Sequence, residues 1–253
     1  MAVTLKMFLI VCPLVFIAGI IDAVAGGGGL ITLPAYIFAG LPVHSAIATN
    51  KLSSTMGTAM ATYKYAKDGF IKWKLAAVCA IFSLLGSHFG AKLSLIISEE
   101  ALKIVILFLL PLTAILILKG KVLDEEREEL SLKATYCLGS IIAFVIGMYD
   151  GFYGPGTGTF LLILLTSVVH LALTDANGIA KVINLSSNFS ALIVYLKSGN
   201  SVVILGLAAG IFSIAGNWIG TNLFASKGVK IAKPFMIIVL AVFFIRELYS
   251  LLD

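Results

Sequence analysis

The sequence predicts an all-α polytopic membrane protein made of two homologous repeats of four to five membrane segments. The repeats are expected to be inverted and to contain Gly-rich broken helices. Three observations lead to this fold class. Of the 253 residues, 60% are hydrophobic and only 12% are charged, whereas an ordinary soluble domain has about 25% charged residues. Long stretches carry no charge, and a Gly-rich element that follows an aspartate occurs twice.

The uncharged stretches have the length of membrane spans, because a helix needs about 20 apolar residues to cross the hydrocarbon core. They cover residues 7–21, 23–50, 75–91, 104–118, 134–149, 151–174 and 198–226. They lack the alternating pattern of about ten residues that marks barrel strands, so the spans are expected to be helices. The net charge of +5 does not indicate nucleic acid, because the positive side chains gather in short connectors.

A duplication divides the chain into two copies. Asp22 stands four residues before the glycines at 26–29, and Asp150 stands four residues before the Gly-rich segment 154–158. Further matches pair Leu52-Ser53-Ser54 with Leu185-Ser186-Ser187, Gly86 and Gly90 with Gly216 and Gly220, and Lys103 with Lys233. We expect a first transmembrane repeat over 1–120, a charged cytoplasmic connector over 121–132, and a second transmembrane repeat over 133–253.

Each copy is expected to contain the same order of elements. A long helix is followed by a Gly-rich break, a short apolar segment and three further helices. In the first copy these elements cover about 5–24, 30–41, 45–66, 74–95 and 101–119, and in the second about 134–150, 158–172, 178–197, 202–224 and 232–250. The pattern leaves open whether the short segments cross the membrane. An odd number of crossings in each copy would invert the copies, and an even number would leave them parallel.

The distribution of lysines favours inverted copies, because cytoplasmic connectors collect positive residues. After the third segment, the first copy has Lys64, Lys67, Lys72 and Lys74, and the second has only Lys197. After the fourth segment, the first copy has only Lys103, and the second has Lys227, Lys230 and Lys233. The bias is reversed, so equivalent connectors are expected to face opposite sides. Both termini would then lie outside the cytoplasm.

The Gly-rich elements are expected to interrupt helices, because glycine is about 0.8–1 kcal/mol less favourable than alanine inside a helix. A helix that begins after such a break directs unpaired N–H groups and a partial positive charge at it, which suits an anion. The substrate-binding candidates in these elements are Gly26, Gly27, Gly28, Gly29, Gly154, Gly156, Thr157 and Gly158. The alternative is a tight corner between helices that needs small residues.

Two lysines inside uncharged sequence are further candidates for substrate binding. Lys51 follows Asn50 about two turns inside a predicted helix, and Lys181 precedes Asn184 in the second copy. A cation within the membrane costs at least about 2.5 kcal/mol on insertion scales, so it points to function. Both lysines could instead extend to the interface or contact carbonyls at a helix end.

Asp22 and Asp150 are candidates for proton coupling or for pairing with these lysines, and they could equally be interfacial residues at helix ends. We expect no enzyme, because the sequence lacks GxSxG, HExxH and Walker A motifs. The three cysteines have no metal-ligand spacing, so no metal site or cofactor is expected.

The chain resembles the TauE/SafE sulfite exporter family, also called the toluene sulfonate uptake permease family. The resemblance lies in IDAVAGGGGLITLP at 21–34 and ATNKL at 48–52, and again in GFYGPGTG at 151–158 and AKVIN at 180–184. It covers essentially the full chain. It implies a multi-span permease, in many cases bacterial, for sulfite, a sulfonate or a related sulfur-containing anion.

Together these observations predict a transporter that moves a small anion across a bacterial inner membrane by alternating access. Its expected partners are the anionic substrate, the lipid bilayer and, as an option left open, further copies of itself. An anion channel is the first alternative, since it would use the same residues. A membrane enzyme or an assembly partner is the second. The substrate, the direction of transport and the coupling ion are not determined by these patterns.

Overall fold

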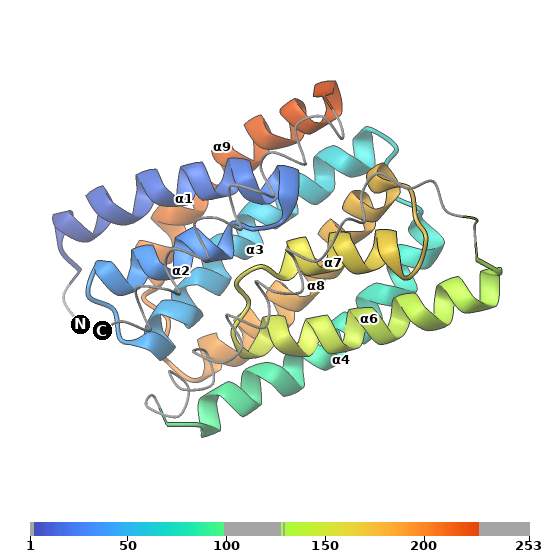
Figure 1. The fold of residues 1–253 in the computed structure, drawn as a ribbon. Coiled ribbons are helices and arrows are strands. Elements are labelled where there is room, and N and C mark those ends of the chain that lie inside the picture. The colour runs from blue at the N-terminus through green and yellow to red at the C-terminus, as the bar shows by residue number, and fades with distance from the viewer. Residues whose placement is uncertain (1–2, 99–127, 129, 228–253) are drawn as a thin grey trace, which may run out of the picture.

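The computed structural model describes residues 3–98, 128 and 130–227. The predicted helices at 101–119 and 232–250, and most of the connector at 121–132, lie outside the described residues. The described part is all-helical (Figure 1). Its elements are α1 (Leu5–Ala25), α2 (Gly29–Phe38), α3 (Val43–Lys67), α4 (Trp73–Ile96), α6 (Leu132–Phe152), α7 (Thr157–Ser167), α8 (Leu173–Lys197) and α9 (Val203–Lys227).

Five of these helices, α1, α4, α6, α8 and α9, are long and apolar enough to cross a membrane. The short helices α2 and α7 have 10 and 11 residues, about 15 Å each at 1.5 Å per residue. A hydrocarbon core about 30 Å thick is therefore too wide for either of them to cross alone. Each turns back beside the long helix that precedes it, so α1 with α2 and α6 with α7 form two hairpins (Figure 1).

The segments predicted within the described residues are confirmed as helices, with two boundaries that differ by five residues. The short segment expected at 158–172 ends at Ser167. The helix expected at 178–197 begins at Leu173 and runs through Gly178. A side chain at Gly178 would come within 2.1 Å of the Phe70 carbonyl oxygen. The glycine therefore permits a close contact inside the helix instead of marking its start. Asp175, in the added first turn, pairs with Lys72 at 2.8 Å.

The long helices of the first half of the chain pack mainly against those of the second half. α4 lies against α6 and α8, α9 lies against α1 and α3, and α3 contacts α8 directly. Glycines allow the closest of these contacts. A side chain at Gly86 or Gly90 would come within 2.1 Å of a carbonyl oxygen of α6, and one at Gly216 or Gly220 within 2.4 Å of a carbonyl oxygen of α1. These four glycines therefore form close-approach faces between the helices.

Two large apolar clusters form most of the core, one toward each end of the bundle, and a small third cluster surrounds Phe160. On α3, Ile47 belongs to the first cluster and Tyr65 to the second. On α8, Ile183 belongs to the second cluster and Ala191 to the first. The residues between these positions include buried Asn, Ser, Thr and Lys side chains. A polar layer therefore separates the two apolar clusters at the middle of α3 and α8.

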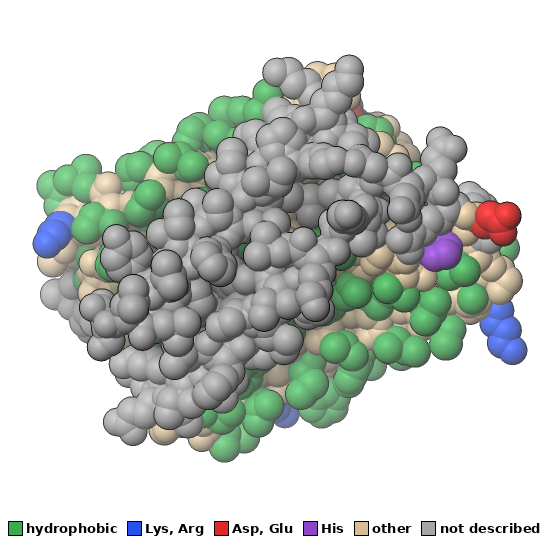
Figure 2. Space-filling model, in the orientation of Figure 1, with side chains coloured by type: hydrophobic (Ala, Val, Ile, Leu, Met, Phe, Trp, Pro, Cys, Tyr) green, Lys and Arg blue, Asp and Glu red, His purple; other side chains and the backbone are tan. Residues whose placement is uncertain are grey.

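The outer surface is apolar. Ile81, Leu85 and Phe89, one turn apart on α4, are 50–58% exposed, and large hydrophobic side chains cover the visible described surface (Figure 2). Most of the charged side chains visible in this view lie at the left and right ends of the molecule, and one Lys or Arg side chain lies at the lower edge. Such a surface suits lipid, and the chain is an integral membrane protein.

The two Gly-rich breaks meet backbone to backbone. Thr159 N donates to the Gly26 carbonyl oxygen at 3.2 Å, and Thr159 Oγ1 donates to the Ala25 carbonyl oxygen at 2.8 Å. Gly26 has a φ of +77°, and a Cβ there would come within 2.2 Å of the Gly158 carbonyl carbon. The first hairpin is thus joined to the second at the point where both helices are interrupted.

We expect Gly26→Ala to destabilise the protein more than Gly69→Ala. Both glycines have a φ of +77°, but no atom lies within 4 Å of a Cβ built at Gly69. The strain of placing alanine at this φ is the same in both variants. The difference in the free energy of unfolding, about 1–3 kcal/mol, therefore comes from overpacking at Gly26. Thermal unfolding of the purified protein in detergent measures this. Equal melting temperatures would mean that the two breaks are not held in contact.

Candidate substrate cavity

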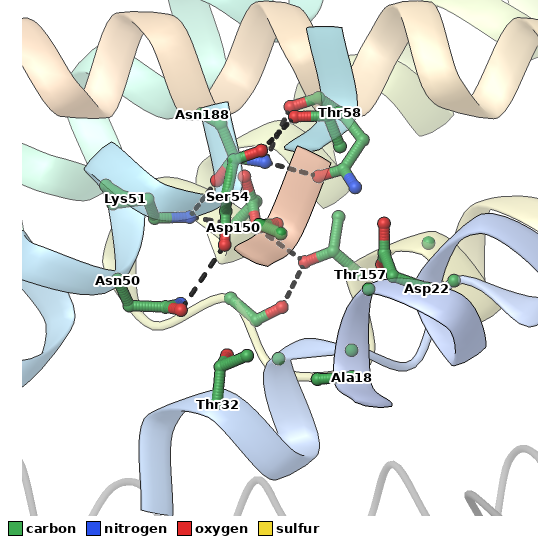
Figure 3. Close-up of a pocket in the computed structure, with 18 of the residues that line it drawn as sticks. Ala18, Asp22, Thr32, Asn50, Lys51, Ser54, Thr58, Asp150, Thr157 and Asn188 are labelled. Atoms are coloured by element: carbon green, nitrogen blue, oxygen red, sulfur yellow. Dashed lines mark hydrogen bonds and ion pairs between the residues drawn. The ribbon is translucent and has the colours of Figure 1, made fainter. Parts of the chain in front are cut away.

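A polar cavity lies where the two hairpins meet α3, α8 and α9 (Figure 3). Its volume is about 30 Å³, room for about two water molecules. Its lining contains eleven residues that the sequence analysis singled out: Asp22, Gly26, Gly28, Gly29, Asn50, Lys51, Asp150, Gly154, Thr157, Gly158 and Asn184. The lining also includes Ala18, Gly19, Thr32, Ser54, Thr58, Asn188, Ser213 and Asn217.

Unpaired backbone amides face this region at the starts of both short helices. Gly26 N donates to the Asp22 carbonyl oxygen, which ends α1 in a left-handed turn. Within the described residues, the N–H groups of Gly28, Gly29 and Gly158 have no hydrogen-bond acceptor. Since α2 and α7 both begin here, their partial positive ends converge on the cavity. The cavity therefore offers backbone donors to an anion.

Lys51 is fully buried and paired. Its Nζ lies 2.9 Å from Asp150 Oδ1 and donates to Asn188 Oδ1 at 3.1 Å. Asp150 also accepts hydrogen bonds from Thr157 Oγ1 at 2.8 Å and Ser187 Oγ at 2.6 Å. Figure 3 shows this bonded group around Asp150 at the centre of the view. The lysine charge is balanced by a carboxylate that is itself held from several sides.

Lys181 makes the corresponding contact with Asp22. Its Nζ lies 3.2 Å from Asp22 Oδ2 and also donates to the Asp22 carbonyl oxygen. In each pair the lysine and the aspartate come from opposite sides of the central connector. Each lysine side chain is 1% exposed, but the Asp22 side chain is 15% exposed and that of Asp150 only 3%. The two pairs thus differ in how far their carboxylates are enclosed.

Asn50 and Asn184 contribute side-chain amides to the cavity wall. Asn50 Oδ1 accepts from Ser54 Oγ at 3.3 Å, and Asn184 Oδ1 accepts from Asn188 Nδ2 at 2.8 Å. These bonds use the amide oxygens and orient the amide nitrogens. Neither Nδ2 has an acceptor in the part of the chain that the structure describes. Both nitrogens are therefore available as donors to a solute.

Three candidates lie beside the cavity without lining it: Gly27, Gly156 and Lys181. Gly27 and Gly156 shape the turns, since Gly27 O accepts from Leu30 N and Gly156 has a φ of +82°. Lys181 is directed at Asp22. These three residues therefore affect the cavity indirectly, by shaping the turns that form its wall or by pairing with Asp22, which lines it.

The sequence analysis missed the polar residues that follow the candidates at helical spacing. Asn50, Ser54 and Thr58 are four residues apart on α3 and line one wall. Ser213 and Asn217 form a similar pair on α9. A four-residue spacing of polar side chains in an otherwise apolar helix was the signal that could have identified them. Thr32 Oγ1 and Asn217 Oδ1 are buried and have no hydrogen-bond partner among the described residues.

The arrangement can hold a small polar solute. The described residues contain no group of three or more His, Cys, Asp or Glu side chains that could hold a metal ion. Both carboxylates at the cavity are paired with lysines. The available groups are donors from amides and hydroxyls, which bind and orient a solute.

Interrupted helices that enclose a polar cavity at membrane depth are the architecture of a membrane transporter. Residues 11–246 match the family described as "Sulfite exporter TauE/SafE". The chain belongs to this transporter family, as the resemblance in its motifs implied.

Individual relatives carry general names. The chain is 35% identical to a "Probable membrane transporter protein ORF9" of Sinorhizobium sp, over 92% of this chain and 89% of that protein. It is 29% identical to the "Probable membrane transporter protein YfcA" of Escherichia coli K12, over 92% of this chain and 87% of the relative. A "Probable membrane transporter protein" of Haemophilus influenzae is 32% identical, over 88% of this chain and 87% of its own length. No solved structure matches the chain.

We expect Lys51→Met to destabilise the protein by about 3–5 kcal/mol, because it leaves Asp150 charged and unpaired in the interior. Adding Asp150→Asn should recover part of this loss, since the double variant buries no uncompensated charge. Thermal unfolding of the single and double variants in detergent gives the comparison.

The matched control is the surface pair of Lys72 and Asp175, whose side chains are 53% and 24% exposed. Lys72→Met should cost at most about 1 kcal/mol, because solvent screens such a pair. A loss for Lys51→Met as small as this would show that the buried pair does not stabilise the fold.

Proposed function

We propose that the protein transports a small sulfur-containing oxyanion across the bacterial inner membrane by alternating access between two inverted repeats. The observation that carries this proposal is the convergence of two helix starts on one polar cavity, where the N–H groups of Gly28, Gly29 and Gly158 have no acceptor among the described residues. The description of the matched family names sulfite, while the names of the relatives specify no substrate.

Equivalent contacts support the duplication. Lys51 and Lys181, 130 positions apart, each pair with the aspartate of the other half. Tyr65 and Tyr195, also 130 apart, donate to the carbonyl oxygens of Ala23 at 2.8 Å and Gly151 at 3.0 Å. This register differs from the shift of 133 positions in the Leu-Ser-Ser match of the sequence analysis. It makes Ser54 the counterpart of Asn184 and Thr58 the counterpart of Asn188.

Chain direction and charge support the inversion. α1 and α6 run in opposite directions through the bundle (Figure 1). The α3–α4 connector lies beside the end of α9, since the rings of Phe70 and Phe224 are 6.2 Å apart. This end carries the lysines at the end of α3 and at the starts of α4 and α6, namely Lys64, Lys67, Lys72, Lys74 and Lys133, while Lys6, Lys92 and Lys197 lie at the opposite ends of α1, α4 and α8. We assign the lysine-rich end to the cytoplasm.

The small volume of the cavity favours a carrier over a channel. A space of about 30 Å³ holds about two waters, so a sulfur oxyanion with three or more heavy atoms requires the walls to separate. The walls come from both halves of the chain. A relative movement of the halves would admit the solute from one side and release it on the other, as in inverted-repeat transporters.

Purified protein in lipid vesicles tests the proposal directly. We expect vesicles that contain the protein to accumulate labelled sulfite, thiosulfate or methanesulfonate, and to release it faster when an unlabelled substrate is added outside. Acetate should compete poorly. Absence of flux for every oxyanion would contradict the proposal, and large single-channel currents would indicate a channel.

We expect Asn50→Ala and Asn184→Ala each to raise the apparent KM for the transported anion by about tenfold, because each removes a hydrogen bond to a charged solute. The control is Asn200→Ala, since Asn200 lies in an exposed loop and bonds only to Ser198 Oγ. Initial uptake rates over a range of anion concentrations give the KM. If both cavity variants behave like the control, the two halves do not share one site.

Cysteine labelling in cells tests the orientation. After Cys12, Cys79 and Cys137 are replaced with serine, Lys67→Cys and Ser226→Cys should react with an impermeant maleimide only when the membrane is opened. Ser198→Cys, at the far end of α8, should react in intact cells. Different accessibility of the first two sites would overturn the inverted topology.

A further inference from the structure

We propose that Asp22 binds a proton that crosses the membrane together with the anion, so that the protein is a proton–anion symporter. This inference rests on the proposed function and adds its coupling ion. The observations that carry it are the charge balance of the cavity and the difference between the two buried ion pairs.

The charges around the cavity sum to zero. Lys51 is balanced by Asp150 and Lys181 by Asp22. A monovalent anion that entered would make this group negative in a region where water cannot compensate for it. If one carboxylate instead bound a proton, the charge of its lysine partner would no longer be balanced within the pair and could balance the anion. Anion binding is therefore favoured by the uptake of one proton at a carboxylate.

The structure distinguishes the two carboxylates. Asp150 contacts Lys51, Thr157 and Ser187 and is 3% exposed. Both of its oxygens are engaged, so a proton would displace an existing bond. Asp22 is 15% exposed and contacts Lys181 through Oδ2 alone. Asp22 Oδ1 has no partner among the described residues and lies on a residue that lines the cavity. A proton can therefore reach Asp22 without disturbing the group around Asp150.

Lys181 can tolerate the neutralisation of Asp22. Its Nζ also donates to the Asp22 carbonyl oxygen, and this bond does not depend on the charge of the carboxyl group. The contact thus persists while the lysine charge becomes available to the anion. At Lys51, the corresponding second partner is Asn188 Oδ1 on another helix.

The other groups that face Asp22 do not replace it in this role. α8 contributes Lys181, α6 contributes Asp150, and α3 contributes Lys51 and Tyr65, whose hydroxyl donates to Ala23 O. The sequences of α2 and α7 have no charged residue, and that of α9 has only Lys227 at its end. Of the two carboxylates in this set, Asp22 is the more exposed, at 15% against 3% for Asp150.

The symport has a defined stoichiometry. The proton binds to a carboxylate oxygen of Asp22 on the side from which the anion enters, and it leaves to water on the side where the anion is released. One proton with one monovalent anion moves no net charge. One proton with a divalent anion moves one negative charge. The two kinds of substrate must therefore respond differently to membrane potential.

Vesicles loaded with a pH-sensitive dye test this mechanism with methanesulfonate as the monovalent probe and thiosulfate as the divalent probe. We expect uptake of either anion to acidify the lumen with one proton per anion. A potassium diffusion potential should alter thiosulfate uptake and leave methanesulfonate uptake unchanged. For methanesulfonate, the affinity should fall by up to about tenfold for each unit of rising pH, as linkage to one proton requires.

Asp22→Asn should remove this pH dependence, hold the affinity at high pH near the value that the unmodified protein reaches at low pH, and make methanesulfonate flux sensitive to the potential. Asp22→Glu keeps a titratable group and should keep the dependence. Asp175→Asn, which removes a carboxylate outside the cavity, is the control and should retain the dependence too. Thermal unfolding verifies that each variant is folded. If Asp22→Asn does not fold, the measurement of luminal acidification by the unmodified protein still tests whether protons move with the anion.

Anion uptake by the unmodified protein without luminal acidification would overturn the symport while leaving anion transport standing. A pH dependence that survives in folded Asp22→Asn would assign the proton to another group and overturn the role of Asp22. Absence of any anion flux would instead contradict the proposed function itself. The two proposals therefore fail in different experiments.

Discussion

The backbone contact between Gly26 and Gly158 is the interaction on which the interior of this protein depends. Unpaired amides at membrane depth are tolerated only where protein or a polar cavity covers them. Each interrupted helix covers the break in the other, through the bonds from Thr159 to Ala25 and Gly26. These contacts leave no space for a Cβ at either glycine, so the two breaks lie directly against each other. The N–H groups of Gly28, Gly29 and Gly158, which have no acceptor among the described residues, are therefore gathered at one shared cavity instead of facing lipid.

The buried charges follow the same constraint. A lysine at this depth is costly unless a carboxylate and further acceptors surround it. Both lysines meet that condition by reaching across the molecule, Lys51 to Asp150 and Lys181 to Asp22. The pairs therefore join the two halves at the cavity. If the halves move during transport, these pairs either travel with the movement or exchange partners with the solute.

The helices could be predicted from sequence because each is specified locally. Long uncharged stretches indicate spans, and runs of glycine indicate breaks. The boundary at Leu173 was missed because Gly178 reads as a helix breaker, whereas it serves a close contact with Phe70. Such a contact is between residues distant in sequence. Local composition holds no information about it.

By itself, the sequence determined that the protein is a helical membrane protein, the family to which it belongs and the residue types that surround the cavity. These follow from composition and motifs, and hydrophobicity over a short window suffices to identify a span. Only the tertiary structure decided that Lys51 meets Asp150 and not Asp22, that Ser213 and Asn217 join the cavity, and that Asp22 is the more exposed carboxylate. The physical reason is that charge pairing and enclosure depend on which helices pack together, and this packing is set by contacts between the two halves of the chain.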